Sequence, residues 1–206
     1  KRCISLKPDY AVAYSNMGNA LKADGKIEAA IHAYKKSISL KPDDAFSYSN
    51  MGNSLKDQGK LDEAIKAYNN AVSLKPDYVE AYSNMGVVLT EQGKLDEAIK
   101  AHIKSLSLKP DYAEAYNNIG NILKEQGKFN DAMMAFNKAL SLNPNLAEVY
   151  SNMASTLIDQ GKCNDAMKAF NKAISLKPDY AEAFNNMGTL ITKQGKICLL
   201  YTSPSP

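Results

Sequence analysis

The chain has 206 residues, of which 45% are hydrophobic and 23% charged, ordinary values for a protein that buries a core. This composition excludes an intrinsically disordered chain, which combines low hydrophobicity with high net charge. A net charge of +3, from 25 basic and 22 acidic residues, is too even to argue for nucleic acid. There is no apolar run of the roughly 18 residues that a transmembrane helix needs, so we expect no membrane span.

Histidine and cysteine are too sparse for a metal centre or an acid–base enzyme. His32 and His102 are the 2 histidines, and neither has a cysteine or carboxylate at ligand spacing. We therefore expect no metal, no cofactor and no catalytic residue. Cys3, Cys163 and Cys198 are far apart and odd in number, which favours a reducing compartment over a disulfide framework. This predicts an intracellular protein, cytoplasmic or alternatively nuclear.

The prolines define the architecture, because six of the eight are each separated by 34 residues. They are Pro8, Pro42, Pro76, Pro110, Pro144 and Pro178. One set of glycines keeps the same step: Gly25, Gly59, Gly93, Gly127, Gly161 and Gly195. A fixed period of this size indicates stacked structural repeats.

In chain order, residues 1–10 are the end of an earlier repeat. Five full repeats follow, at 11–44, 45–78, 79–112, 113–146 and 147–180, and together span 11–180. A partial sixth repeat covers 181–197, and 198–206 form a tail without the pattern.

Each repeat has the pattern of two helices, as in the fourth. Tyr116, Ile119 and Leu123 form one stripe of a helix predicted over 115–126. Gly127 ends it, since glycine adopts the left-handed conformation without penalty. A second helix is predicted from about 128 to 142, where Pro144 prevents its continuation.

An acidic or amide residue before several first helices suggests a capping box. Asp111 with Glu114 has the required spacing, in which the Asp side chain accepts a backbone hydrogen bond and the Glu reaches back. The same arrangement recurs at Asp77/Glu80, Asn145/Glu148 and Asp179/Glu182.

Small residues predict close packing within each helix pair. Gly120 lies on the first helix, and we expect it to face the second, where Ala132 and Ala139 recur as Ala or Ser in every complete repeat. One pair cannot bury both of its apolar faces, so stacking must complete the core. The fold class predicted is all-α: a right-handed superhelical solenoid of antiparallel helix pairs with a concave and a convex side.

The pattern resembles the tetratricopeptide repeat (TPR) family over residues 1 to about 197. In the fourth repeat the family's signature places hold Tyr116, Ile119, Gly120, Leu123, Ala132, Phe136, Ala139 and Pro144. A related RNA-binding helical-repeat family has a period one residue longer, and the glycine, alanine and proline signature favours TPR instead. The resemblance implies a non-catalytic scaffold that binds proteins or peptides in its concave groove.

One asparagine recurs in every repeat, two residues after the signature aromatic. These residues, the asparagine ladder, are Asn16, Asn50, Asn84, Asn118, Asn152 and Asn186. An amide both donates and accepts, so such a column could pair with an extended peptide backbone of any sequence. It is similar to the ladder that holds the acceptor protein in the repeat arm of O-GlcNAc transferases. The alternative is that these side chains only bond to a neighbouring helix.

A second polar row follows one and two helical turns further on. It consists of Asn19, Asn53 and Asn121, then Lys22, Lys56 and Lys124. These residues could hold a peptide with acidic groups, or they could form a solvated face. TPR adaptors that hold a chaperone's C-terminal carboxylate have a lysine just before the ladder asparagine. Here Ser49, Ser83 and their equivalents stand there, so a chaperone-tail clamp is incomplete.

The third and fifth repeats interrupt this row. Val87 and Thr90 replace Asn and Lys in the third, and Ser155 and Ile158 do so in the fifth. They could form shallow apolar pockets that select side chains, or they could reflect drift.

Both ends interrupt the pattern. Lys1 begins inside a second helix, and after Ile197 the period predicts an acidic pair that the sequence lacks. We expect 198–206 to come from a foreign reading frame, or alternatively to be a flexible tail. The helix predicted over 181–194 should then lack a partner and expose apolar residues.

The function predicted is a scaffold that binds proteins or extended peptides, with no nucleic acid, membrane or small-molecule ligand. The first alternative is the recognition arm of an O-GlcNAc transferase-like glycosyltransferase whose catalytic domain is not in this chain. The second is a structural spacer within a larger complex.

Overall fold

The structure is a computed structural model that describes residues 9–202, with side-chain surroundings described as far as Thr192. The predicted end of an earlier repeat therefore lies outside the described residues except for Asp9 and Tyr10. So do residues 203–206 of the tail. The described residues form eleven helices and no strand, and they divide into two compact units at Pro110–Asp111.

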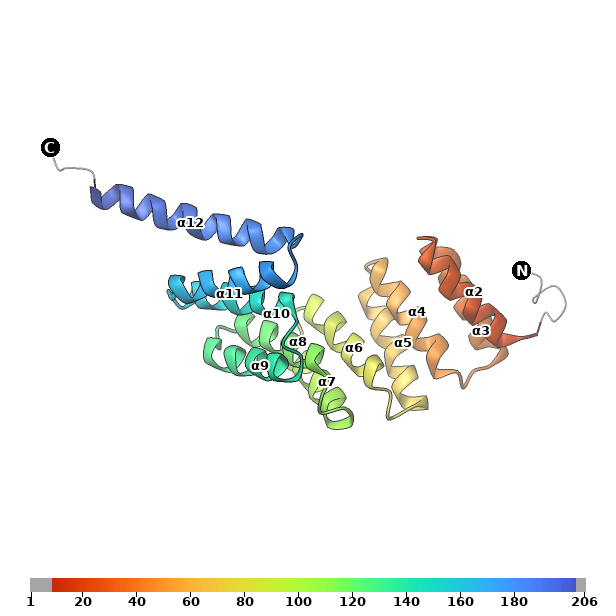
Figure 1. The fold of residues 1–206 in the computed structure, drawn as a ribbon. Coiled ribbons are helices and arrows are strands. Elements are labelled where there is room, and N and C mark those ends of the chain that lie inside the picture. The colour runs from red at the N-terminus through yellow and green to blue at the C-terminus, as the bar shows by residue number, and fades with distance from the viewer. Residues whose placement is uncertain (1–8, 203–206) are drawn as a thin grey trace. The chain divides into compact units, whose positions relative to one another are not determined.

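The first unit contains three helix pairs, coloured red to green in Figure 1. The pairs are α2 (Ala11–Ala23) with α3 (Ile27–Leu40), α4 (Ala45–Asp57) with α5 (Leu61–Leu74), and α6 (Val79–Glu91) with α7 (Leu95–Leu108). The first helices of neighbouring pairs also touch, α2 with α4 and α4 with α6.

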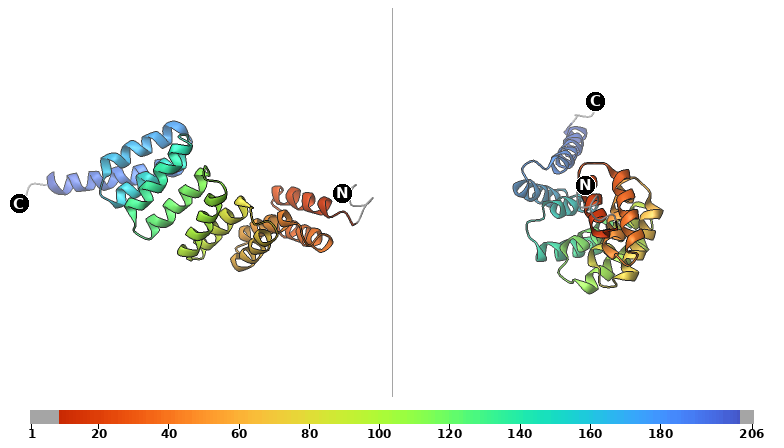
Figure 2. Two further views of the ribbon diagram at one scale, coloured as in Figure 1. Left: turned by 90° about the horizontal axis from the view of Figure 1, so that it is seen from below. Right: turned by 90° about the vertical axis from the view of Figure 1, so that its right-hand side faces the viewer.

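The second unit contains two further pairs and one longer helix. They are α8 (Ala113–Glu125) with α9 (Phe129–Leu142), α10 (Ala147–Asp159) with α11 (Cys163–Leu176), and α12 (Ala181–Thr202). Figure 2 gives two more views of the paired helices in each unit. The predicted all-α fold of antiparallel helix pairs is confirmed.

A three-residue turn closes each pair, and the glycine in it has a left-handed conformation. Gly59 has φ 73°, a region that other residues enter only at a steric cost. Its N–H donates to Lys56 O at 2.8 Å, and the Lys60 N–H donates to Leu55 O at 2.9 Å. These two bonds form a Schellman motif, which satisfies the last carbonyls of α4 and reverses the chain.

The capping boxes predicted before the first helices are wrong. The Tyr78 N–H donates to Lys75 O at 3.1 Å, which closes a β-turn with Pro76 and Asp77 at its centre. Asp77 is therefore held in the turn, and the residue that precedes α6 is Tyr78, whose side chain makes no capping bond. The same holds for Tyr112 before α8 and Leu146 before α10.

A side-chain cap occurs instead before the second repeat, where an aspartate stands in place of the tyrosine. Asp44 accepts from the Phe46 N–H at 3.2 Å and from the Ser47 hydroxyl at 2.6 Å. The carboxylate thus satisfies a free N–H at the start of α4.

The first helices of the first four repeats lie close to their partners because a glycine faces a ring. A Cβ atom at Gly52 would lie 2.8 Å from Tyr68 Cε1, and one at Gly86 would lie 2.6 Å from His102 Nε2. The glycine therefore faces the second helix, as expected for Gly120, and the nearest atoms there belong to an aromatic side chain. The rings at this place are buried completely: Tyr34, Tyr68, His102, Phe136 and Phe170.

The last helix departs from the repeat. The glycine spacing predicts an end before Gly195, whereas α12 continues to Thr202. On its described part, Phe184 and Ile191 are about half exposed. A Cβ atom built at Gly188 would have no neighbouring atom within 4 Å. This glycine therefore faces no ring, unlike the equivalent glycines of the first four repeats.

Candidate functional site: amides on the first helices

The strongest candidate site is a row of amide side chains in the first unit. The row consists of Asn19 on α2, Asn50 and Asn53 on α4, and Asn84 on α6. Each of them retains exposed surface. We call these four residues the amide row.

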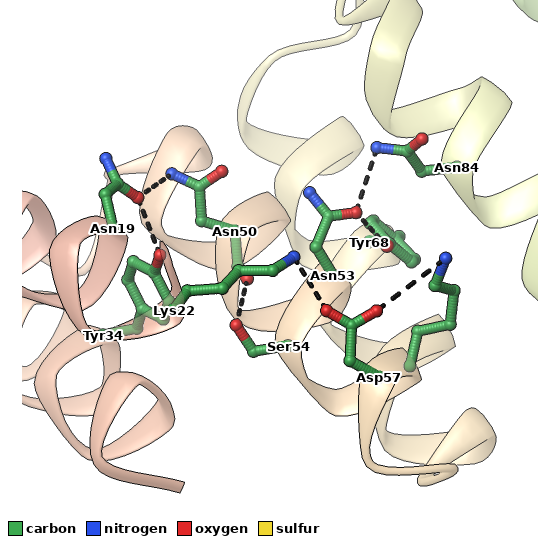
Figure 3. A network of polar contacts seen from close by, with 10 residues as sticks. Asn19, Lys22, Tyr34, Asn50, Asn53, Ser54, Asp57, Tyr68 and Asn84 are labelled. Carbon is green, nitrogen blue, oxygen red and sulfur yellow. Dashed lines mark hydrogen bonds and ion pairs between the residues drawn. The ribbon is translucent and has the colours of Figure 1, made fainter. Parts of the chain in front are cut away.

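Each hydrogen bond between two asparagines of the row joins adjacent repeats. Nδ2 of Asn50 donates to Oδ1 of Asn19 at 3.1 Å, and Nδ2 of Asn84 donates to Oδ1 of Asn53 at 3.1 Å (Figure 3). The structure thus brings together the ladder asparagines and the second polar row, which the sequence placed on the same face. Asn50 and Asn84 thus each bond to the second-row residue of the preceding repeat.

Tyrosines of the second helices donate hydrogen bonds to the same asparagine oxygens. The Tyr34 hydroxyl donates to Asn19 Oδ1 at 2.7 Å, and the Tyr68 hydroxyl donates to Asn53 Oδ1 at 2.6 Å (Figure 3). Burial raises the pKa of Tyr34 to about 12. Burial, and secondarily the nearby Asp57 and Glu91, also raises the pKa of Tyr68. Both hydroxyls therefore keep their protons and remain donors at physiological pH.

The predicted lysines make contacts with aspartates of the array. Nζ of Lys22 lies 3.0 Å from Oδ2 of Asp57, and Nζ of Lys56 lies 3.9 Å from Oδ1 of the same residue. In the second unit, Nζ of Lys124 lies 3.7 Å from Oδ2 of Asp159 and donates to Ser155 Oγ. These contacts compensate much of the positive charge that an acidic peptide would need.

The amides of the second unit are arranged differently. Nδ2 of Asn152 donates to Oδ1 of Asn117 at 3.0 Å, and Nδ2 of Asn117 donates to Oε1 of Glu148 at 3.2 Å. Asn117 stands immediately before the ladder residue Asn118. The partner of the ladder asparagine therefore occupies a different repeat position from its partner in the first unit. Phe136, at the repeat position of Tyr34 and Tyr68, carries no hydroxyl. Of the remaining ladder residues, Asn16 is exposed, and Asn118 and Asn186 are half-buried.

Two family profiles match the sequence of this chain. A family profile described as "TPR repeat" matches residues 18–59, 52–90 and 154–195. A second one, described as "Tetratricopeptide repeat", matches residues 77–144. These matches cover more than half of the chain. The chain belongs to the tetratricopeptide repeat family.

Solved TPR proteins have the same fold. MamA is 26% identical with a TM-score of 0.70, and the alignment covers 84% of this chain and 94% of MamA. YrrB, described as a TPR protein with an unusual peptide-binding site, is 22% identical with a TM-score of 0.68, over 90% of this chain and 95% of YrrB. The pilF protein of Pseudomonas aeruginosa is 20% identical with a TM-score of 0.72, over 94% and 93%. No curated protein matches the sequence.

The third TPR repeat lacks the tyrosine–asparagine bond. His102 replaces the tyrosine, and Val87 replaces the second-row asparagine. His102 is fully buried, and neither ring nitrogen has a hydrogen-bond partner. Thr90, predicted to line a pocket, donates its hydroxyl to the Gly86 carbonyl at 3.0 Å within its own helix.

The sequence indicated the amides of this TPR array but not the residues that orient them. The missed residues are Tyr34, Tyr68 and Glu148, which bond to the amides. Asp57 and Asp159, which contact the lysines, were also missed. One signal was present: the first two repeats have Tyr together with Asn, whereas the third has His with Val and the fifth has Phe with Ser. Tyrosine at this place thus accompanies a hydrogen-bond acceptor one helix away.

Two further features bear on function. Within the described residues, no three His, Cys, Asp or Glu side chains come together where they could hold a metal ion. No helix in the part of the chain that the structure describes is long and apolar enough to cross a membrane.

Proposed function

We propose that this TPR chain binds proteins through an extended segment that lies across the first helices of a unit and is read mainly by its backbone. The contacts come from the asparagine ladder, Asn16, Asn50, Asn84, Asn118, Asn152 and Asn186. In the first unit they are joined by Asn19 and Asn53. The chain itself supplies binding and no chemistry.

One observation carries this proposal: the four amides of the amide row have polar atoms left over after bonding to each other. Oδ1 of Asn50 and of Asn84 accepts no hydrogen bond from another described residue, and Nδ2 of Asn19 and of Asn53 donates none. Exposed amide atoms that are already held in place lose little entropy when they bind a partner. The TPR fold supports a protein-interaction role.

The contacts of the lysines favour a neutral backbone over an acidic peptide as ligand. Lys22 and Lys56 lie beside Asp57, so an incoming carboxylate would meet a negative charge as well as two positive ones. Lys124 has a similar neighbour in Asp159. We therefore propose that Lys22 and Lys124 join adjacent repeats and that all three lysines contribute little to peptide affinity.

The test begins with a random peptide library displayed against the full chain. The affinity of a selected peptide is then measured for the wild type and for the variant Asn50→Ala with Asn84→Ala. Loss of two hydrogen bonds worth about 1 kcal/mol each should weaken binding roughly 30-fold. Lys66→Ala on α5, an exposed residue outside the row, is the control. Unchanged affinity in the double asparagine variant would remove the proposal.

The glycosyltransferase-arm alternative is tested separately. The complete coding sequence around this segment is read outward in both directions. A nucleotide-sugar domain in the same chain would make the array a substrate-recognition arm, and its absence would favour a free-standing adaptor or a spacer. The peptide screen separates those two, since a spacer should select no peptide.

A further inference from the structure

Each second-row asparagine in the first unit has its carbonyl oxygen fully used. Oδ1 of Asn53 accepts from the Tyr68 hydroxyl at 2.6 Å and from Nδ2 of Asn84 at 3.1 Å. Oδ1 of Asn19 accepts from Tyr34 at 2.7 Å and from Asn50 at 3.1 Å. An amide oxygen has two lone pairs, so both are occupied. Flipping the amide would break both bonds, and the orientation is therefore fixed.

The fixed orientation determines which atoms remain for a partner. Along the amide row these are Nδ2 of Asn19, Oδ1 of Asn50, Nδ2 of Asn53 and Oδ1 of Asn84, which is the order donor, acceptor, donor, acceptor. Figure 3 shows these atoms on the side of the row opposite to Asp57. The edge of an extended polypeptide presents N–H and C=O groups in the complementary alternation.

We infer that Tyr34 and Tyr68 are positioning residues for ligand binding, because their hydroxyls fix this alternation. The class of partner follows from the alternation: an extended main chain with unblocked N–H groups, read along one edge across α2, α4 and α6. This inference rests on the proposed function and adds the residues that orient the site.

The third helix pair marks where this arrangement ends within the first unit. Val87 occupies the second-row place on α6, and His102 occupies the place of the tyrosine on α7. A valine has no amide to orient, and the buried imidazole donates to no residue there. The part of a ligand that lies over this pair therefore meets an aliphatic side chain in place of a donor.

Replacing tyrosine by phenylalanine tests the inference without disturbing the core. Phe136 and Phe170 occupy the same place in the fourth and fifth repeats and are fully buried, so the fold accepts phenylalanine there. The variant is Tyr34→Phe with Tyr68→Phe in the full chain. The probe is a peptide selected from a random display library on the wild type. We expect its affinity to fall about fivefold or more.

Tyr48→Phe is the matched control. It removes a hydroxyl from a half-buried tyrosine of α4 that makes no side-chain hydrogen bond with another described residue. We expect wild-type affinity for this variant. Equal loss in the control and the double variant, or no loss in either, would overturn the inference.

A double-mutant cycle separates positioning from a general structural effect. Once Asn53→Ala has removed the amide, Tyr68→Phe should have no further effect on affinity, because there is nothing left to orient. A fall of the same size in both backgrounds would overturn the positioning role.

The outcomes also separate this inference from the proposed function. Loss of affinity in Asn50→Ala with Asn84→Ala, but not in the tyrosine variants, would leave the proposed function standing and contradict the inference alone. Failure to select any peptide would contradict both.

Discussion

His102 is the residue with the least favourable surroundings in the described part of the chain. It stands where other repeats carry tyrosine or phenylalanine, and it is fully buried with both ring nitrogens unpartnered. Burial lowers its pKa from 6.5 to about 4, because the imidazolium would lose its hydration without gaining a partner. The surrounding side chains therefore pack against this ring without satisfying its polar atoms.

This lowered pKa predicts acid sensitivity. Below pH 6.5 the unfolded chain takes up a proton at His102 that the folded chain refuses down to about pH 4. Stability should therefore fall as the pH decreases through this window, by about 3 kcal/mol in total. His102→Phe should remove this contribution, whereas His32→Gln, at an exposed residue, should retain it. Denaturant unfolding at pH 7, 5.5 and 4.5 measures the difference; an identical pH dependence in both variants would contradict it.

The capping residues show at the same scale why a local motif can mislead. The spacing from Asp77 to Glu80 fits a capping box, but the preceding proline places Asp77 inside a β-turn closed by the Tyr78 N–H. The sequence contained both signals, and the proline turn determined the backbone. Asp44, one place later in its repeat, is positioned to cap α4.

Removing this cap should therefore cost more than removing the turn residue. Asp44→Ala should lower the free energy of unfolding by about 1 kcal/mol, since the Phe46 N–H at the start of α4 loses its acceptor. Asp77→Ala, at an exposed residue, should cost much less. Urea denaturation measures the free energy of unfolding of both variants. Equal losses of stability would contradict the assignment of the cap to Asp44.

At the scale of the element, the helix pair depends on the contact between a glycine and a ring. The period predicted the pairs because glycine and proline punctuate every repeat, and the helices of the fourth repeat begin and end within two residues of the prediction. The ring that the glycine contacts was not predicted, because spacing on one helix does not determine which side chain of the other reaches it. The fifth repeat accommodates Ala154 beside Phe170, both fully buried, so the distance within a pair can adjust.

Two glycine substitutions test this contact against each other. In Gly52→Ala the new Cβ would lie 2.8 Å from Tyr68, and the strain should lower stability by about 1–2 kcal/mol. In Gly188→Ala the new Cβ meets no atom within 4 Å, and better helix propensity should raise stability by up to about 1 kcal/mol. Thermal melting followed by circular dichroism measures both variants. The same sign of change in each would show that the ring contact does not restrict this place.

At the scale of the whole molecule, the helix pairs within each unit contact mainly their neighbours in the sequence. Stability in such an array is a sum of pair and interface contributions. The sequence predicted this architecture well, because one pattern is repeated many times. It could not predict the tyrosine–asparagine bonds, which join residues of different helices and, through the ladder asparagine, two repeats.

A local defect should therefore remain local. In Gly52→Ala, amide hydrogen exchange should become faster in α4 and α5 and stay unchanged in α10 and α11. Exchange measured by mass spectrometry resolves these segments. Equally accelerated exchange throughout the array would show that it unfolds as one cooperative body.

The central claim is that the amide row reads a peptide backbone, and backbone N-methylation tests it most directly. A peptide selected on the wild-type chain is resynthesised with one N-methyl group at a time, and its affinity is measured by calorimetry. We predict that affinity falls strongly at alternate positions, where an N–H along one edge is blocked, while changes to most side chains have a smaller effect. Retained affinity at every methylated position would contradict backbone recognition and place the specificity in the side chains.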